Sequence, residues 1–425
     1  MGSNAPAQAK SFQKRLSELY GKTESASQAK RYLDLAQRAS EAFGGEPRFF
    51  SAPGRTELGG NHTDHNRGRV LCAAVTLDIA AAVVPSEGTE VELWSDGWER
   101  PFRVDLARTD PVASERGTTE ALIRGVAEGF AEAGYRTGGF KGILNSRVPA
   151  GSGLSSSAAL EVLLGTIQSG LYNDGKVRPE ELAGIGQRAE NRHFGKPCGL
   201  MDQTASAVGG ILVIDFENPG TPRIRKIKAD FEKEGYALAV VSTGGSHADL
   251  TEDYAAIPRE MREAASVFGK ETLRGLEPGQ LLRKLPEVRA AAGDRAALRA
   301  LHFLEENERV LSMAKALEDG RVKRFLKLAG RSGSSSWRYL QNVLAPGDPR
   351  NQGLALALAL SEFLLGKRGA CRVHGGGFEG TLLAFIPLDG FKEYRETMDR
   401  VLGPGCVTRL RIREEGAGEI RQKET

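Results

Sequence analysis

Residues 149–164, PAGSGLSSSAALEVLL, run from a turn of small residues directly into a stretch with helical spacing. Glycine lets the backbone approach a ligand closely, and a helix N-terminus offers unpaired N–H groups and partial positive charge. This combination predicts a phosphate-binding loop, although a serine-capped turn of the same composition needs no ligand. The candidate phosphate-binding residues are Gly151, Ser152, Gly153, Leu154, Ser155, Ser156 and Ser157.

Two acidic residues further along have positions that suit chemistry on a hydroxyl group. Asp202 lies in CGLMDQ shortly before the apolar run GILVIDF, and Glu190 stands upstream near the end of a predicted helix. One such carboxylate can orient or deprotonate a hydroxyl group, and the other can hold a magnesium ion. Acidic loop residues also occur on solvated surfaces, and that alternative stays open at this point.

Residues 52–68, APGRTELGGNHTDHNRG, form a polar block between two predicted strands. Arginine, glutamate, aspartate and two histidines stand among four glycines, a density of hydrogen-bonding groups that suits a polyol ligand. His62, Asp64 and His65 are also possible metal ligands, but their spacing matches neither HxxxH on a helix nor a set with cysteines. A polyol site is therefore the first expectation.

Two other glycine motifs fail the tests of their context. Gly21-Lys22-Thr23 has Leu16 where a Walker A loop needs its leading glycine. Residues 374–380, HGGGFEG, have G-x-G-x-x-G spacing, but the apolar run TLLAFIP after them reads as a strand rather than a helix. The sequence thus excludes a P-loop NTPase and argues against a dinucleotide fold.

Strands and helices are mixed in both halves of the chain. Helical spacing predicts two amphipathic helices between Ser11 and Phe43, then helices in residues 155–172, 179–194 and most of 249–344, and FKEYRETMDRVL near the end. Short apolar runs predict strands at RFFSAP, RVLCAAV, IAAAVV, TEVELW, FRVDL, KGILNSRV, GILVIDF, YALAVVSTG, GACRVHGG, TLLAFIP and CVTRLRI. This mixture in both halves predicts two α+β domains that join between Asp215 and Tyr236.

Composition is that of an ordinary soluble globular protein. The chain has 425 residues, 40% hydrophobic and 27% charged, with a net charge of +3, so neither a nucleic acid nor a membrane is an expected partner. The apolar stretches are shorter than the roughly 18 residues of a membrane span. The cysteines, which are far apart, predict neither a zinc site nor a disulfide framework and favour a cytoplasmic location: Cys72, Cys198, Cys371 and Cys406. We expect a small-molecule ligand and a monomer or weak homo-oligomer.

Four blocks in this order resemble the GHMP kinases, and among them the galactokinase family. APGRTELGGNHTDHNRGRVL is similar to the galactokinase signature, VPAGSGLSSSAALEV to the phosphate-binding motif, ENRHFGKPCGLMDQ to the stretch around the catalytic aspartate, and VHGGGFEGTLLAF to the third glycine motif. The resemblance implies an α+β fold of two domains: a ribosomal-protein-S5-like domain over residues 1–220 and a ferredoxin-like domain over residues 221–425. The active site would lie in the cleft between them.

The resemblance also implies an activity, the transfer of the ATP γ-phosphoryl group to the anomeric hydroxyl of a sugar. Asp202 would accept or orient the hydroxyl proton and Arg55 would act beside it, with Ser156 and Glu190 as magnesium ligands and Ser155 or Ser157 as substitutes for Ser156. The residues implied to bind the sugar are Asn61, His62, Asp64 and Tyr254. Those implied to support the phosphate loop from the second domain are Gly375, Gly376 and Gly377.

Departures from the family pattern concern the sugar. Galactokinases usually carry Asn at Glu57, Glu at Asn61, Tyr at His65 and Gly at Glu379, and an arginine pair where Ile257 and Pro258 stand. The family glutamate at position 61 binds the C6 hydroxyl of galactose, so a neutral amide there would no longer repel a C6 carboxylate. Galactose is the first expectation and galacturonate, or another C6-modified hexose, the alternative. A second alternative is a galactokinase-like sugar sensor without catalysis.

Overall fold

The computed structural model describes residues 5–149, 151–244, 251–344, 347, 349–378 and 380–421, with only the backbone for residues 5–10 and 251. Glu379, one of the departures from the family pattern, lies outside the described residues. The described strands form two sheets, one of eight strands and one of four. Mixed α and β structure is thus present in both halves of the chain, as the sequence predicts.

The eight-stranded sheet has the order β12-β1-β2-β5-β3-β4, and β6 and β7 extend it from β2. Its strands are antiparallel except for the parallel pair β3 and β5. The strands are β1 (Arg48–Gly59), β2 (Arg69–Pro85), β3 (Glu90–Ser95), β4 (Phe102–Asp105), β5 (Phe140–Ser146), β6 (Ile211–Asp215), β7 (Arg223–Ile227) and β12 (Gly418–Glu419).

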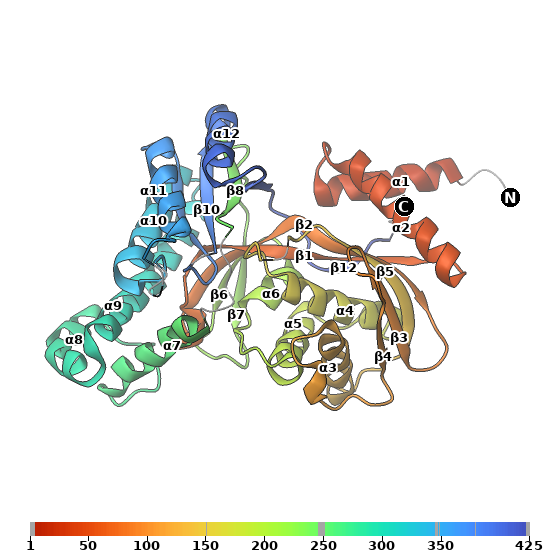
Figure 1. The fold of residues 1–425 in the computed structure, drawn as a ribbon, viewed down its shortest axis with the longest axis horizontal. Helices are drawn as coiled ribbons and strands as arrows, with labels where there is room; N and C mark the ends of the chain where they lie inside the picture. Colours follow the sequence, from red (N-terminus) through yellow and green to blue (C-terminus); the bar gives the residue numbers. More distant parts are fainter. Residues whose placement is uncertain are drawn as a thin grey trace.

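Helices cover both faces of this sheet, as Figure 1 shows. The long strand β2 is apolar over most of its length because it is buried on both faces. On one face lie α3 (Thr119–Glu132), α4 (Ser156–Tyr172), α5 (Pro179–Ala189) and α6 (Met201–Val208); on the other lie α1 (Ala5–Tyr20) and α2 (Ser25–Phe43). The two predicted strands RVLCAAV and IAAAVV are therefore one strand, since nothing between them turns the chain.

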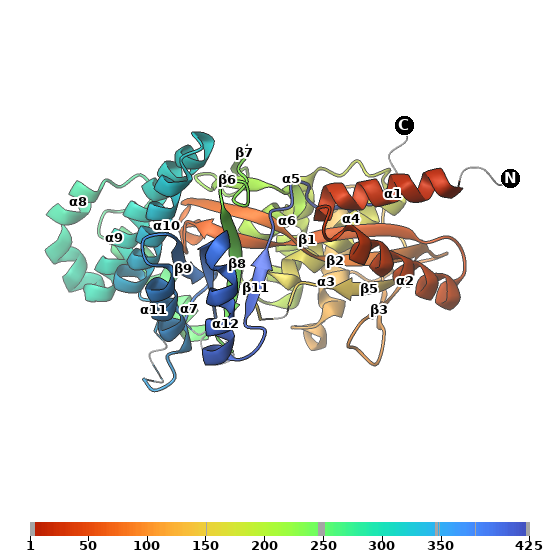
Figure 2. The same cartoon turned by 90° about the horizontal axis from the view of Figure 1, so that it is seen from above.

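The four-stranded sheet has the order β11-β8-β10-β9, all antiparallel. Its strands are β8 (Tyr236–Ser242), β9 (Ala370–His374), β10 (Thr381–Pro387) and β11 (Val407–Leu410). The helices on this side of the molecule are α7 (Thr251–Ser266), α8 (Pro278–Arg283), α9 (Leu285–Glu318), α10 (Val322–Ser335), α11 (Gly353–Leu365) and α12 (Phe391–Leu402). Figure 2 shows them beside the first sheet, on the side opposite α1 and α2.

The end of β1 lies where the two halves of the molecule meet. Arg372 on β9 donates to the backbone oxygen of Glu57 on β1 at 2.8 Å, and Glu306 on α9 accepts from the N–H of Gly60 at 3.0 Å. The polar block that begins on β1 is therefore enclosed by elements from both halves. The division of domains at residue 220 stays a prediction; β7 and β12 lie beyond it and belong to the first sheet.

Within the described residues, the search for a helix long and apolar enough to cross a lipid bilayer finds none.

Candidate active site

The glycine-serine loop connects β5 to α4 and is fastened to β1. Gly151 and Gly153 have φ angles of +71° and +70°, a left-handed conformation that favours glycine. A Cβ atom on Gly153 would lie 2.7 Å from Thr381 Oγ1, so the loop packs closely against β10. The N–H of Arg55 donates to the backbone oxygen of Leu154 at 3.0 Å. This bond brings Arg55 to the loop, as the predicted roles require.

Arg55 and Asp202, which are 147 positions apart, form a bidentate ion pair. Arg55 Nε donates to Asp202 Oδ1 at 2.6 Å, and Nη2 donates to Oδ2 at 2.7 Å. The third guanidinium nitrogen of Arg55, Nη1, donates to the backbone oxygen of Gly153. The Ser155 hydroxyl donates to the Asp202 carboxylate. The guanidinium is buried, whereas 27% of the carboxylate side chain stays exposed.

The environment keeps Asp202 ionised. Burial works to raise the pKa of this carboxyl, but the charge of Arg55 and the hydrogen bonds from Arg55 and Ser155 outweigh it and hold the pKa below its usual range. The carboxylate is therefore an acceptor at neutral pH. Its exposed part can accept a hydrogen bond from a ligand hydroxyl.

Glu190 begins a π-helical turn, Glu190–Phe194, at the end of α5. Its buried carboxylate accepts from Ser157 Oγ and Gln203 Nε2, each at 3.0 Å, and pairs with Lys196 Nζ at 3.3 Å. Gln203 Nε2 also donates to Glu161 at 2.9 Å. Burial, and then the charge of Glu190, raise the pKa of Glu161 well above its usual range.

This oxygen-rich cluster suits a magnesium ion. Carboxylate and hydroxyl oxygens are the donors that Mg²⁺ prefers, and Glu161 Oε1 is buried without a hydrogen-bond partner among the described residues. The hydroxyl in contact with Glu190 is that of Ser157, while the hydroxyl of Ser155 is bound to Asp202. Of the serines that the sequence left open, Ser157 is hydrogen-bonded to the predicted metal ligand Glu190.

A cavity of about 210 Å³ opens beside the Arg55–Asp202 pair. His62 hydrogen-bonds through Nε2 to the backbone oxygen of Gly376 at 3.0 Å, and the Tyr254 hydroxyl donates to that of Gly377 at 3.1 Å. The third glycine motif therefore holds two predicted sugar-binding side chains. The cavity is lined by Arg55, Glu57, Asn61, His62, Asp64, His65, Lys196, Pro197, Cys198, Gly199, Met201, Asp202, Tyr254, Gly375 and Gly376.

Among the predicted sugar residues, His62 and Asp64 differ in environment. Burial, and then the neighbouring His65, lower the pKa of His62 to about 4, so its imidazole is neutral at pH 7. Asp64 lies against the loop before α6, since a Cβ atom on Gly199 would meet its Oδ2. Its backbone neighbour His65 is exposed at the cavity rim and donates its N–H to Asp64 Oδ1 at 3.0 Å.

Asn61 is wholly buried, and its amide is occupied by other parts of the protein. Nδ2 donates to Glu57 Oε1 at 3.1 Å and to the backbone oxygen of Gly375 at 2.7 Å. Oδ1 accepts from Asn342 at 2.8 Å and from Ser336 at 3.3 Å. Two donors and two acceptor sites are all that an amide side chain has. In this arrangement the Asn61 side chain links the polar block of residues 52–68 to the third glycine motif by hydrogen bonds.

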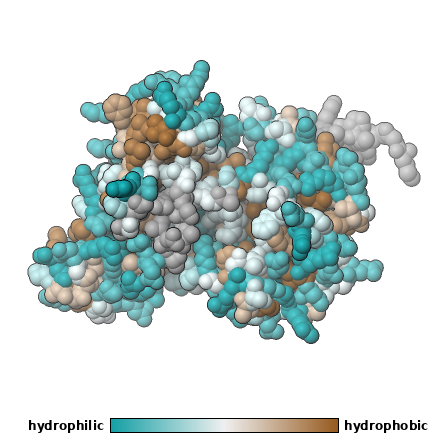
Figure 3. Space-filling view, viewed as in Figure 1, coloured by the Kyte–Doolittle hydropathy of each residue, from teal (hydrophilic) through white to brown (hydrophobic). Residues whose placement is uncertain are grey.

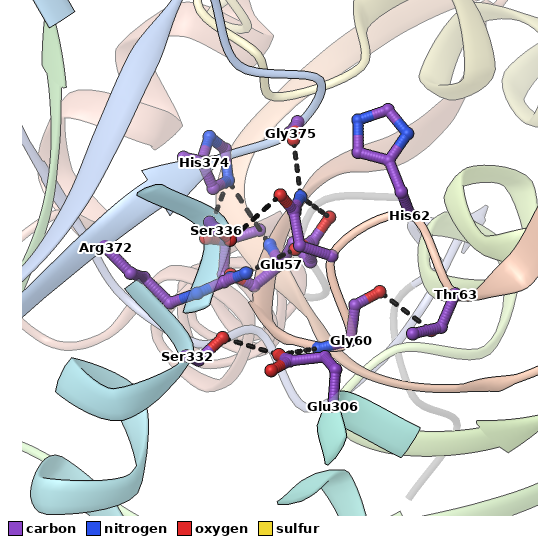
Figure 4. Close-up of polar contacts among 12 residues, drawn as sticks. Glu57, Gly60, His62, Thr63, Glu306, Ser332, Ser336, Arg372, His374 and Gly375 are labelled. Atoms are coloured by element: carbon purple, nitrogen blue, oxygen red, sulfur yellow. Dashed lines mark hydrogen bonds and ion pairs between the residues drawn. The ribbon is translucent and has the colours of Figure 1, made fainter. Parts of the chain in front are cut away.

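Figure 4 shows the network around this block. Arg372 Nη2 forms an ion pair with Glu57 Oε1 at 2.7 Å, and both side chains are buried. His374 Nε2 accepts from the N–H of Glu57 at 3.2 Å, which leaves Nδ1 to donate to Thr381 at 3.1 Å. Burial, and then Arg55, lower the pKa of His374 well below its usual range. Below them in the same view, Glu306 accepts a hydrogen bond from the N–H of Gly60 and another from the Ser332 hydroxyl.

The structure brings the predicted residues together and adds others that sequence reasoning missed. Gly153 and Ser155 contact the Arg55–Asp202 pair, and Ser157 contacts Glu190. Gly375, Gly376 and Gly377 hold Asn61, His62 and Tyr254. Sequence reasoning missed Lys196, Arg372 and His374. Lys196 and His374 carried a signal, because each stands in a matched block, six positions before Asp202 and directly before Gly375; Arg372 carried none. Ile257, in place of a family arginine, is buried in the core between α7 and α9.

Family profiles match two parts of this region. The profile described as galactokinase galactose-binding signature matches residues 40–85, and that described as GHMP kinases N terminal domain matches residues 121–210. The first contains Arg55, Asn61, His62 and Asp64; the second contains the glycine-serine loop, Glu190 and Asp202.

Curated relatives match most of the chain. A galactokinase from Actinobacillus pleuropneumoniae serotype 3 is 30% identical over 384 residues, which cover 89% of this chain and 94% of the relative. A galactokinase from Mannheimia succiniciproducens is 31% identical over 352 residues, covering 81% of this chain and 86% of the relative. Both relatives are named as kinases, and the prediction of an enzyme is confirmed.

Solved structures confirm the fold class. Lactococcus lactis galactokinase, solved in complex with galactose, has a TM-score of 0.78 and 24% identity, covering 92% of this chain and 99% of that one. Methanococcus jannaschii mevalonate kinase has a TM-score of 0.61 and 16% identity, covering 87% and 99%. These two similarities concern the fold, and the curated relatives add the chemistry. The chain therefore belongs to the galactokinase family of the GHMP kinases and is a phosphotransferase that acts on a sugar.

Proposed function

We propose that this sugar kinase transfers the γ-phosphoryl group of ATP to the anomeric hydroxyl of galactose and releases galactose 1-phosphate and ADP. The observation that carries the proposal is the pair of Arg55 and Asp202 beside the glycine-serine loop and the cavity. Phosphoryl transfer requires an aligned acceptor and neutralised charge more than covalent help from the protein. The site offers both.

Asp202 orients the acceptor hydroxyl. Its lowered pKa makes it a weak base, so it accepts a hydrogen bond from the anomeric hydroxyl and takes the proton as the new O–P bond forms. Arg55 holds the carboxylate in place through two hydrogen bonds and keeps it ionised. The Ser155 hydroxyl, on the glycine-serine loop, donates to the same carboxylate. This bond connects the residue that orients the sugar hydroxyl to the loop that faces the phosphates.

The left-handed glycines at 151 and 153 shape the loop that faces the triphosphate. Glu190 with Ser157, or with Ser156, would hold Mg²⁺, and the bound ion supplies positive charge against the phosphate oxygens. On the sugar side His62, neutral at pH 7, can donate to or accept from a ring hydroxyl, while Asp64 accepts and Tyr254 closes the cavity.

Galacturonate is the second candidate, and the charges around the cavity favour it. Of the carboxylates that line the cavity within the described residues, Glu57 and Asp202 are each ion-paired with an arginine, which leaves Asp64. Lys196 and His65 stand on the same cavity. A C6 carboxylate would therefore meet less negative charge than the count of acidic residues implies.

An assay of ADP release against galactose, galacturonate, glucose and galactosamine tests the substrate, with the position of the phosphate read by NMR. Galactose should give the highest kcat/KM and a 1-phosphate product. A higher kcat/KM for galacturonate would replace galactose by the second candidate, and a product phosphorylated elsewhere would overturn the assignment of Asp202.

Asp202→Asn is the matched variant for the mechanism. The amide keeps the shape of the side chain and loses its charge, so sugar and ATP should still bind while turnover falls by about 10²–10⁴-fold. Calorimetric titration with the sugar and with ATP separates loss of binding from loss of chemistry. Turnover close to that of the wild type would show that this carboxylate neither accepts nor orients the hydroxyl proton.

A further inference from the structure

Lys196 lies on the cavity, in the loop between the Glu190 turn and α6. The N–H groups of Gly195 and Lys196 both donate to the backbone oxygen of Glu190, at 3.0 and 3.1 Å. Gly195 has a φ of +83°, a left-handed conformation that turns the chain back on itself. This turn brings the Lys196 ammonium to 3.3 Å from the Glu190 carboxylate.

Among the described residues that line the cavity, Arg55 and Lys196 are the permanent cations at neutral pH, and they differ in what they can still bind. Each of the three nitrogens of Arg55 already donates within the protein, two to Asp202 and one to Gly153. Lys196 makes one ion pair, and 63% of its side chain is exposed. An ammonium has three donors. Lys196 therefore retains donors for a ligand in the cavity.

The charges near Lys196 also belong to the predicted point of transfer. The Glu190 carboxylate lies on the phosphate side beside Ser157, and Asp202 lies on the acceptor side beside Arg55. The charges of both carboxylates act on Lys196.

We propose that Lys196 is a further catalytic residue, whose ammonium contacts the phosphoryl group as it passes from ATP to the sugar. The inference rests on the proposed function. In this step the bond from the γ-phosphorus to the bridging oxygen of ADP breaks, the bond from the sugar oxygen to phosphorus forms, and the hydroxyl proton goes to Asp202. Lys196 keeps its proton and neutralises charge on the transferring oxygens.

The competing role is structural. Glu161 and Glu190 share the Gln203 amide, so in this role Lys196 would only offset the repulsion between two buried carboxyl groups. A residue that acts only in this way supports the fold and every ligand equally. A residue that contacts the transferring group affects kcat and transition-state analogues while the ground-state complexes stay intact.

Lys196→Met, Lys196→Arg and the control Lys176→Met separate these roles. Lys176 is likewise an exposed lysine with one acidic partner, Asp174 at 3.1 Å, and it does not line the cavity. For each variant we would measure kcat, KM for ATP and for the sugar, the affinity for ADP alone, the affinity for ADP with aluminium fluoride and sugar, and the melting temperature. The last three readouts do not depend on turnover.

Lys196→Met should lower kcat and the affinity for ADP–aluminium fluoride by about 100-fold, with ADP affinity and the melting temperature unchanged. Lys196→Arg should recover about tenfold of that loss because it restores the charge. Lys176→Met should match the wild type. The proposal is overturned if Lys196→Met keeps kcat within about threefold of the wild type, or if ADP affinity, sugar affinity and melting temperature fall together.

If Lys196→Met fails to fold, Lys196→Arg still tests the proposal. An arginine variant that folds and loses tight binding of ADP–aluminium fluoride, with its affinity for ADP unchanged, supports a contact between Lys196 and the transferring phosphoryl group. Failure of the proposed function looks different. In that case the wild type phosphorylates another sugar or position, and the same comparison of variants is made with that acceptor.

Discussion

At the scale of single residues, Glu57 and Asn61 form an exchanged pair. Galactokinases usually carry asparagine at the first position and glutamate at the second, and this chain has them the other way round. In the structure the two side chains are hydrogen-bonded at 3.1 Å, and Arg372 neutralises the carboxylate. One carboxylate and one amide thus remain in contact after the exchange. The sequence alone suggested that Asn61 faces the sugar, whereas the structure gives its amide four protein partners.

This arrangement predicts that Asn61→Glu destabilises the protein. A second carboxylate would be buried beside Glu57 and would meet the backbone oxygen of Gly375 in place of an N–H donor, so the free energy of unfolding should fall by about 3 kcal/mol. Urea denaturation measures this loss. Glu57→Asn combined with Asn61→Glu should recover about 1–3 kcal/mol relative to the sum of the single variants.

Strict additivity of the two substitutions would contradict the pairing. The double variant also tests the sugar: if its ratio of kcat/KM for galactose over galacturonate equals that of the wild type, position 61 does not discriminate at C6. A large rise in that ratio would support the sequence prediction that position 61 acts on the sugar.

At the scale of elements, the glycine-serine loop is held by its contacts with β1 and β10 as much as by its own sequence. Gly151 and Gly153 have nearly the same left-handed φ, but their surroundings differ. A Cβ atom on Gly151 would meet nothing within 4 Å, whereas one on Gly153 would meet Thr381 Oγ1 at 2.7 Å and His374 Nδ1 at 3.0 Å. Of the two glycines, it is therefore Gly153 that packs against β10 and the third glycine motif.

We predict that Gly153→Ala impairs the enzyme more than Gly151→Ala. Both variants carry the same strain from a positive φ, about 1 kcal/mol, and only the first also forces β10 away from the loop. The expected difference in the free energy of unfolding is about 1–3 kcal/mol, and KM for ATP should rise more in Gly153→Ala than in Gly151→Ala. Equal effects of the two substitutions would show that the loop does not pack on β10.

At the scale of the whole molecule, Asp78 joins both ends of the chain to the first sheet. Its buried carboxylate pairs with Arg31 on α2 at 2.6 Å and with Arg413 near the C-terminus at 3.3 Å, and it accepts from Tyr20 on α1 at 2.6 Å. Figure 1 shows β12, the last strand, on the same side of the molecule as α1 and α2. The surface on this side of the molecule is mostly hydrophilic, as Figure 3 shows. On the other side, an apolar patch lies over α11, the helix on which Phe363 is exposed.

Asp78→Asn should lower the free energy of unfolding by about 3–5 kcal/mol at pH 7, because two buried guanidinium groups lose their counter-charge. Burial works to raise the pKa of Asp78, but Arg31 and Arg413 outweigh it and the pKa is lowered. A carboxyl with a lowered folded-state pKa adds stability above its unfolded pKa and loses it as the pH falls. The difference between variant and wild type should therefore shrink below about pH 4.

The matched control is Asp96→Asn, since Asp96 pairs with Arg38 on the same helix α2 at 2.7 Å but both side chains are 39% exposed. A solvent-exposed pair contributes less than about 1 kcal/mol. Chemical denaturation as a function of pH measures both variants. A loss in Asp78→Asn no larger than in Asp96→Asn would show that the buried cluster does not hold the termini.

The sequence by itself determined the chemistry of the blocks and the type of most elements. Glycine and serine before a helix, acidic residues before the apolar run GILVIDF and apolar runs of strand length are local properties. They predict a phosphate loop, candidate carboxylates and mixed α and β structure. Local patterns did not indicate β7 or β12, which are short and polar and become strands only because β6 and β1 offer a free edge.

Only the tertiary structure decided which residues meet. Arg55 and Asp202 are 147 positions apart, and Glu57 and Arg372 are 315 apart, so no spacing in the sequence pairs them. The same holds for Asn61, whose partners come from the third glycine motif and from the segment after α10. Whether a polar side chain faces a ligand or the protein depends on the burial of its neighbours, and that is a property of the packed molecule.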